Sequence, residues 1–279
     1  MERYRKVSEL KSRLSGLKNN KTVGFVPTMG ALHRGHLSLI ALCKSMCDLT
    51  VASIFVNPTQ FNDVADYQRY PRTLEKDAAI LEKAGCDIVF TPDENEIYPE
   101  KDNRIFDFGD LDKVMEGKFR PGHFNGVAQV VSRLFDIVNP DKSFFGQKDF
   151  QQVSIIKNMV KQLNLTTEIV VCPIVRELDG LAMSSRNVLL SERQRKEAAK
   201  ISQALFNAKK QAIATPINEI KDEAVRQINL SPELRVEYLE IVDANTLQPV
   251  AEWDDSSEIF ACVAVHAGKI RLIDNVQLK

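Results

Sequence analysis

Short apolar runs alternate with helical spacing along the first part of the chain. The runs Thr22–Val26, Leu49–Val56 and Asp87–Phe90 are typical of buried strands, and a proline follows each within two residues. Between these runs, Leu37–Cys47 and Leu74–Ala84 have the spacing of helices. We therefore predict parallel strands joined by right-handed helical crossovers.

The alternation continues to about residue 175. Further helices are expected at residues 5–18, 127–138 and 151–163, and further strands at 143–145 and 167–172. The sequence therefore predicts an α/β fold. Its first domain, residues 1–176, is expected to be a doubly wound, Rossmann-like parallel sheet that binds the nucleotide.

The last hundred residues have a different pattern. Two helices rich in charge and alanine are expected at 191–214 and 217–228, followed by strands at 235–242, 258–265 and 270–273. Gly268 and Lys269 predict a hairpin turn between the last two strands. Helices followed by antiparallel strands predict a smaller α+β lid domain over residues 177–279.

Composition narrows the class of protein. The 279 residues are 44% hydrophobic and 27% charged with a net charge of -1, which argues against a basic protein that coats nucleic acid. Five scattered cysteines are a poor disulfide framework and are expected to be buried thiols. No apolar run is long enough to span a bilayer and no signal-peptide pattern opens the chain, so we expect a cytoplasmic protein.

The loop after the first predicted strand carries a His-x-Gly-His element, His33-Arg34-Gly35-His36. Gly30 would let the main chain approach a phosphate, and a helix beginning after His36 would favour an anion at its N-terminus. Two imidazoles at this spacing can donate to phosphate oxygens and stabilise charge on a leaving pyrophosphate. The alternative is a helix cap with two surface histidines.

Two further loops contain residue types that bind phosphates. In the first, Gly146–Asp149, Lys148 would neutralise a phosphate and Asp149 would hold Mg²⁺ or a ribose hydroxyl. In the second, Met183–Asn187, two serine hydroxyls and an arginine form a phosphate-binding set. Ordinary capped turns are the alternative for both loops.

Amide and carboxylate side chains complete the candidates. Gln60 follows the second strand, and Gln151 and Gln152 begin a helix, where uncharged amides would bind a carboxylate or hydroxyl. The alternative for these amides is a set of polar caps. Asp77 would place a carboxylate near the metal, or would lie on a solvated helix face.

Six motifs in fixed order resemble those of the pantothenate synthetase (pantoate–β-alanine ligase) family within the nucleotidylyltransferase superfamily. They are Pro27-Thr-Met-Gly with His33-x-Gly-His36, Phe55-Val-Asn-Pro-x-Gln-Phe61, Tyr70-Pro-Arg-Thr73, Arg120-Pro-Gly-His-Phe-x-Gly-Val127, Phe145-Gly-x-Lys-Asp-x-Gln-Gln152 and Met183-Ser-Ser-Arg-Asn187. The resemblance runs from about residue 22 to the C-terminus and is thin after residue 190. One departure is Gln147, where many members are expected to have Glu.

The resemblance implies a two-step reaction. Pantoate attacks the α-phosphate of ATP to give pantoyl adenylate and pyrophosphate, and β-alanine then displaces AMP to give pantothenate. It assigns catalysis to His36, assisted by His33 and Lys148, and substrate binding to Gln60 and Gln152. The implied ATP-binding residues are Met29, Gly30, Ala31, Leu32, His33, Arg34, Gly35, His36, Gly146, Gln147, Lys148, Asp149, Val175, Met183, Ser184, Ser185 and Arg186. It also implies Mg²⁺, with Asp77 as a candidate ligand, and a homodimer.

Two other functions remain open from the residues. One is a nucleotidyltransferase that leaves AMP on a phosphorylated acceptor, although Gln60 and Gln152 suit an uncharged or carboxylate end better than a phosphate. The other is a nucleotide-binding regulator without turnover. The presence of both histidines and the lysine argues against the regulator.

Overall fold

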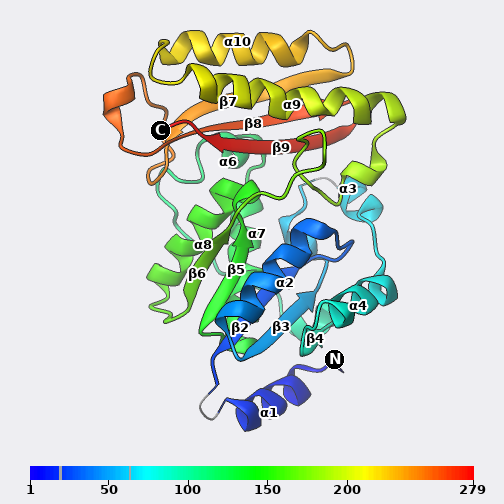
Figure 1. The fold of residues 1–279 in the computed structure, drawn as a ribbon. Helices are drawn as coiled ribbons and strands as arrows, with labels where there is room; N and C mark the ends of the chain where they lie inside the picture. Colours follow the sequence, from blue (N-terminus) through cyan, green and yellow to red (C-terminus); the bar gives the residue numbers. More distant parts are fainter. Residues whose placement is uncertain (19–20, 63) are drawn as a thin grey trace. The chain divides into compact units, whose positions relative to one another are not determined.

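A computed structural model describes residues 1–18, 21–62 and 64–279 (Figure 1). The chain forms two compact units. The first unit comprises Met1–Phe108, Arg120–Gly146 and Gln152–Cys172, and the second comprises Gly109–Phe119, Gln147–Gln151 and Pro173–Lys279. Three segments of the predicted first domain, 109–119, 147–151 and 173–176, thus belong to the second unit. Among the described residues, no helix combines the length and apolar character needed to cross a bilayer.

The first unit contains a six-stranded parallel sheet in the order β1-β4-β3-β2-β5-β6, which confirms the predicted fold class. Its strands are β1 (Glu2–Tyr4), β2 (Val23–Thr28), β3 (Leu49–Ile54), β4 (Ile88–Phe90), β5 (Lys142–Gly146) and β6 (Glu168–Cys172). Its α-helices are α1 (Val7–Leu17), α2 (Arg34–Met46), α3 (Val64–Arg69), α4 (Leu74–Lys83), α5 (Glu94–Ile97), α7 (His123–Val138) and, from Gln152 onward, α8 (Phe150–Gln162). The edge strand β1 was not predicted.

Helices cover both faces of this sheet (Figure 1), and neighbouring residues of a strand point to opposite faces, so β2 contacts helices on both sides. A Cβ at Gly24 of β2 would lie 2.3 Å from the Cys43 sulfur of α2, so only glycine lets α2 pack this closely. The next residue, Phe25, makes an edge contact with Phe135 of α7 at 6.3 Å between ring centroids. Burial raises the pKa of the Cys43 thiol to about 12, so it remains an unreactive part of the core.

The strand order reverses between β2 and β5. The chain continues from β2 to β3 and β4 on one side, whereas β5 is followed by β6 on the other side. Because β2 and β5 are parallel neighbours, Thr28 and Gly146 end their strands at the same edge of the sheet. Ligands of doubly wound folds bind at such a switch point.

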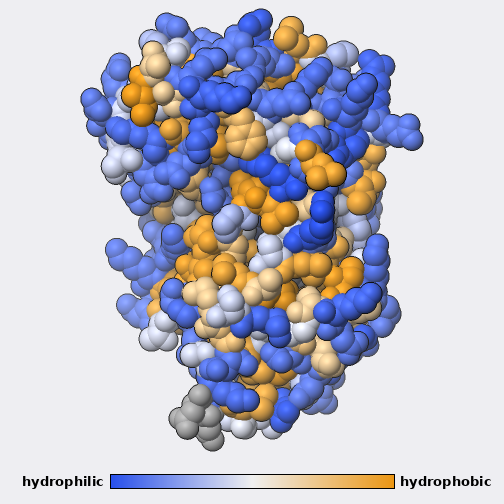
Figure 2. Space-filling view, in the orientation of Figure 1, coloured by the Kyte–Doolittle hydropathy of each residue, from blue (hydrophilic) through white to orange (hydrophobic). Residues whose placement is uncertain are grey.

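The second unit contains a three-stranded antiparallel sheet in the order β7-β8-β9. Its elements are α6 (Met115–Phe119), α9 (Glu192–Gln211), α10 (Ile217–Asn229), β7 (Leu234–Asp243), β8 (Ile259–Ala267) and β9 (Ile270–Gln277). Alternate residues of β8 face different clusters: Val263 packs with α9 and α10, and Cys262 packs with residues of the 109–119 segment. Figure 2 shows hydrophilic residues over most of the outward surface of α9 and α10.

Candidate active site

The loop that follows β2 is held in an unusual main-chain conformation by a buried carboxylate. Gly30 and Ala31 have φ values of 83° and 50°, in the left-handed region. Asp77 of α4, 1% exposed, accepts hydrogen bonds from the N–H groups of Ala31 (2.9 Å) and Leu32 (2.8 Å). A Cβ at Gly30 would lie 3.0 Å from the same carboxylate, so glycine permits this close approach.

The two histidines of the His-x-Gly-His element form the cap of α2. The prediction that the helix begins after His36 was wrong, because α2 begins at Arg34 with His33 as its N-cap. The His33 Nδ1 accepts from the Gly35 N–H at 3.1 Å, and the His36 Nδ1 accepts from the His33 N–H at 3.3 Å. These bonds form a capping box in which imidazole nitrogens replace the usual hydroxyl and carboxylate oxygens.

This cap determines which ring nitrogen carries the proton. A main-chain N–H can only donate, so Nδ1 of both His33 and His36 must be unprotonated. The neutral tautomer of each ring therefore carries its proton on Nε2. The two rings lie 4.1 Å apart between centroids. Each Nε2–H is a donor that can serve an oxygen atom of a phosphate.

The side chain of Gln60 belongs to a turn, η1 (Pro58–Gln60), that follows β3. Its Nε2 lies 2.8 Å from the Met29 sulfur, so the structure brings together two residues to which the family resemblance assigns different substrates. His123 Nδ1 donates to the Gln60 carbonyl at 2.7 Å, since His123 Nε2 accepts from the Arg120 guanidinium at 3.1 Å. His123 is buried in the first turn of α7.

Asn57 fixes the orientation of the Gln60 amide. The Gly126 carbonyl can only accept, so it selects the Asn57 Nδ2, which also donates to Gln60 Oε1 at 3.3 Å. The Tyr98 hydroxyl donates to Asn57 Oδ1 at 2.9 Å. Gln60 consequently directs its own Nε2 donor toward Met29.

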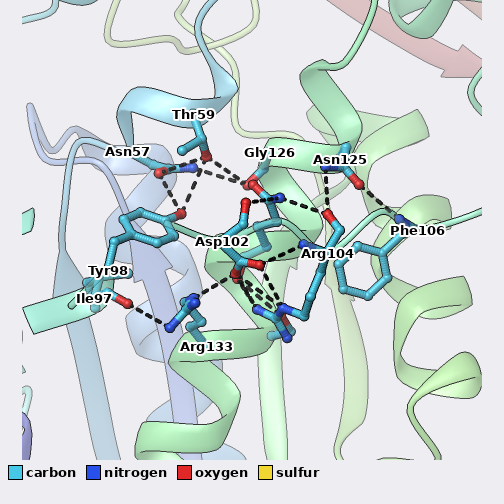
Figure 3. A network of polar contacts seen from close by, with 12 residues as sticks. Asn57, Thr59, Ile97, Tyr98, Asp102, Arg104, Phe106, Asn125, Gly126 and Arg133 are labelled. Carbon is cyan, nitrogen blue, oxygen red and sulfur yellow. Dashed lines mark hydrogen bonds and ion pairs between the residues drawn. The ribbon is translucent and has the colours of Figure 1, made fainter. Parts of the chain in front are cut away.

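An ion-pair network supports this turn through Tyr98, the residue that donates to Asn57. Asp102, whose side chain is 2% exposed, pairs with Arg104 and with Arg133, in both cases at 2.7 Å (Figure 3). Hydrogen bonds from Arg104, and then from Arg133, hold the pKa of Asp102 far below its usual range. The Arg133 guanidinium also lies 5.2 Å from the centre of the Tyr98 ring, a cation–π contact.

The phosphate-binding candidates Lys148 and Asp149 belong to the second unit, in a turn labelled η2 (Gln147–Asp149). The Lys148 Nζ lies 3.4 Å from Asp149 Oδ1, and the side chain of Asp149 is 45% exposed. In the other segment, the Met183 N–H donates to the Val175 carbonyl at 3.0 Å, and the Arg186 N–H donates to the Ser184 hydroxyl at 3.2 Å. Both segments are therefore folded turns.

The structure distinguishes the two neighbouring glutamines. Gln151, in the second unit, is buried and forms hydrogen bonds with the main chain of Leu111, Val114 and Glu116, so it has a structural role. Gln152 is half-buried and belongs to the first unit with Gln60. No positioning role was predicted for Asn57, because its place before Pro58 is typical of an ordinary strand end.

The two candidate metal ligands, Asp77 and Asp149, lie in different surroundings. The described part of the chain contains no group of three or more His, Cys, Asp or Glu side chains arranged to hold a metal ion. Both carboxylate oxygens of Asp77 accept main-chain N–H groups, and one also accepts the Thr73 hydroxyl at 3.0 Å. Asp149 is the more exposed carboxylate.

Comparison with known proteins gives one consistent result. The family model described as Pantoate-beta-alanine ligase matches residues 2–277. The pantothenate synthetase of Porphyromonas gingivalis is 51% identical over 278 residues, which cover 99% of both chains.

Solved structures agree with this match. The crystal structure of pantothenate synthetase from Thermus thermophilus has a TM-score of 0.94 at 43% identity, covering 100% of this chain and 99% of that chain. The pantoate-beta-alanine ligase from Francisella tularensis, complexed with beta-gamma ATP and beta-alanine, has a TM-score of 0.83 at 38% identity. That match covers 99% of this chain and 97% of the other.

Proposed function

Because the chain belongs to the pantoate-beta-alanine ligase family, and so is an ATP-using ligase that forms pantothenate from pantoate and β-alanine, we propose that it acts through a pantoyl adenylate. A pantoate carboxylate oxygen attacks the α-phosphorus of ATP, and pyrophosphate leaves. The amine of β-alanine then attacks the activated carbonyl carbon, loses a proton and displaces AMP. Both nucleophiles are substrates, so the protein contributes positioning and charge stabilisation.

The capped first turn of α2 is the observation that carries these roles. Its main-chain hydrogen bonds leave the ring protons on Nε2, where His36 serves as the donor to the leaving pyrophosphate and His33 assists at the phosphates. Lys148 and Arg186, with Ser184 and Ser185, are proposed to neutralise the phosphates. The remaining ATP contacts follow the family motifs between Met29 and Arg186.

Gln60 and Gln152 are proposed to bind pantoate, and Gln60 is proposed to contact β-alanine as well. The Nε2 of Gln60, which faces Met29, supports this role, because it is a donor and the oxygens of a hydroxy acid accept. An amide also avoids placing a second negative charge beside a substrate carboxylate.

Magnesium is proposed to bind mainly through the phosphate oxygens of ATP, with Asp149 as the exposed protein carboxylate. When bound, the ion would neutralise charge on the phosphates. A homodimer is proposed from the family resemblance, and size-exclusion chromatography with light scattering tests it. A cytoplasmic location is proposed with support from the free thiols of the described cysteines.

The test is to incubate the protein with ATP, Mg²⁺, pantoate and β-alanine and to omit each in turn. Free AMP should require all four, and pyrophosphate should form without β-alanine in a first turnover. An adenylylated product in place of AMP would contradict the ligase mechanism.

Two variants at one position separate catalysis from helix capping. His36→Ala should lower pantoate-dependent pyrophosphate release by about 10²-fold or more, as should Lys148→Ala. His36→Asn keeps an acceptor close to the position of Nδ1 but lacks Nε2, so it should lose similar activity while melting close to the parent protein. Near-parental turnover of His36→Asn would remove His36 from the chemistry.

A further inference from the structure

Two consecutive polar residues near the end of the chain are buried in the middle of a strand. Asp274 and Asn275 of β9 are 3% and 2% exposed. Buried polar side chains are costly unless each is hydrogen-bonded, so the partners of these two residues indicate why they are tolerated. Their partners lie in the segments Gln147–Gln151 and Pro173–Lys279, which belong to the second unit like β9 itself.

Asn275 holds η2, the turn that contains Lys148. Its Nδ2 donates to the carbonyl of Gln147 at 2.9 Å and to the carbonyl of Lys148 at 3.0 Å. The Gln147 amide approaches Asn275 Oδ1 at 3.5 Å. One buried amide therefore binds two successive peptide groups of η2, which fixes the direction in which the Lys148 side chain leaves the main chain.

Asp274 holds the 175–186 segment through Arg176. Arg176 forms a bidentate ion pair with the Asp274 carboxylate, at 2.6 and 2.9 Å, and donates to the Gly180 carbonyl at 3.0 Å. Arg176 also pairs with Ala182 in an isolated β-bridge, directly before Met183. The same guanidinium donates to the Asn275 carbonyl at 3.2 Å, so the two systems are joined.

We propose that Asp274 and Asn275 are a positioning pair for ATP, which fixes the Lys148 turn and the 175–186 segment to one strand. This inference rests on the proposed roles of Lys148 and Arg186 as phosphate ligands. Neither Asp274 nor Asn275 touches ATP. The advantage is geometric, because a misplacement of about 1 Å in a positioning contact costs as much as 10²-fold in rate.

A double-mutant cycle tests the link to Lys148. Asn275→Ala should lower kcat/KM for ATP by about 10- to 100-fold, and KM for β-alanine should change less than about twofold. If Asn275 acts through Lys148, its replacement should cost less than about threefold once Lys148 is alanine, because coupled residues are not additive. Asp274→Asn combined with Arg186→Ala tests the other segment in the same way.

The same strand provides a matched control. Gln277 is exposed, and its amide donates only to the Lys279 carbonyl among the contacts described, at 3.0 Å, so Gln277→Ala should leave kcat/KM for ATP unchanged. Thermal melting checks folding in every variant. If Asn275→Ala does not fold, Asn275→Ser takes its place, because its hydroxyl keeps one donor. The kcat/KM of Asn275→Ser for ATP should then lie below that of the parent protein.

The outcomes separate this inference from the proposed function. Equal losses from Asn275→Ala with and without Lys148, or an equal rise in the KM of all three substrates, would overturn the positioning role. Parental activity in the Lys148→Ala variant would instead overturn the proposed phosphate contact, and the positioning role with it. A large loss in Lys148→Ala that is not deepened by Asn275→Ala supports both.

Discussion

Replacing Asp77 by asparagine tests whether this carboxylate supports the loop or binds the metal. In the structure, Oδ2 accepts the Ala31 N–H and the Thr73 hydroxyl, whereas Oδ1 accepts the Leu32 N–H. Asparagine has the same shape but one acceptor oxygen. Its NH₂ group must therefore face one of the two main-chain donors.

The magnitude follows from these contacts. A hydrogen bond to a charged group contributes about 1.5–3 kcal/mol, and a bond between neutral groups contributes about 1 kcal/mol. Asp77→Asn loses one charged bond and reduces the other to a neutral one, so we expect the first unit to lose about 3 kcal/mol of stability. Because Asp77 is 1% exposed, solvent offers the freed N–H little compensation.

Urea unfolding and steady-state kinetics measure the two consequences. The loop carries the proposed ATP contacts, so KM for ATP should rise by about tenfold while the Mg²⁺ concentration for half-maximal activity stays constant at saturating ATP. Thr73→Val is the control, since it removes one donor and keeps the charge; because Thr73 is exposed, it should cost about 1.5 kcal/mol, the low end for a bond to a charged group. Unchanged stability with a strongly raised Mg²⁺ requirement would refute loop support and restore Asp77 as a metal ligand.

Two further predictions concern packing and pH. Gly126→Ala should destabilise the protein by about 1–3 kcal/mol and raise KM for pantoate, because the added Cβ would lie 2.3 Å from the Thr59 oxygen next to Gln60. Gly16→Ala, in α1 with nothing within 4 Å, should instead stabilise by about 0.5–1 kcal/mol in the same urea titration. Asp102→Asn should cost about 2–3 kcal/mol at pH 7. Because the pKa of Asp102 is low in the folded protein, its full contribution to the free energy of unfolding is present above about pH 4 and is lost as the pH falls further. The stabilities of parent and variant should therefore converge in acid. A stability difference between parent and Asp102→Asn that stays constant down to about pH 3 would contradict the lowered pKa of Asp102.

The sequence was most informative where burial alone defines an element. β2 and β3 are buried on both faces and read as continuous apolar runs, so they were predicted within two residues at either end. α4 was also predicted, together with the role of Gly85 at its end. Gly85 has a φ of 77°, and the hydrogen bonds from Gly85 and Cys86 to Glu82 and Leu81 form a Schellman motif.

The sequence misled where polar residues carry the structure. The first turn of α2 contains Arg34, Gly35 and His36, which have no apolar periodicity, and its cap uses imidazole nitrogen where a serine or aspartate oxygen is the usual signal. The edge strand β1 was missed for a related reason. It has three residues, and its hydrogen-bonding partner β4 lies more than 80 positions away in the chain.

β9 shows the same limit at the other end of the chain. Its strand was predicted to end at Ile273, because Asp274 and Asn275 are turn-forming residue types. The strand instead continues to Gln277, and both residues are buried within it. Periodicity cannot detect such residues, because their partners are carbonyls and a guanidinium in segments about 100 to 130 positions earlier.

Main-chain groups set the polarity of the side chains proposed to act on substrate. The Gly126 carbonyl can only accept, so it determines which end of the Asn57 amide faces Gln60 and then which end of the Gln60 amide faces Met29. The N–H groups of His33 and Gly35 can only donate, and they determine which nitrogen of each imidazole carries the proton. Every peptide group offers the same donor and acceptor, so no residue type in the sequence marks these partners. At these positions, a substitution of the same size that exchanges a donor for an acceptor should therefore lower activity more than one that only shortens the side chain.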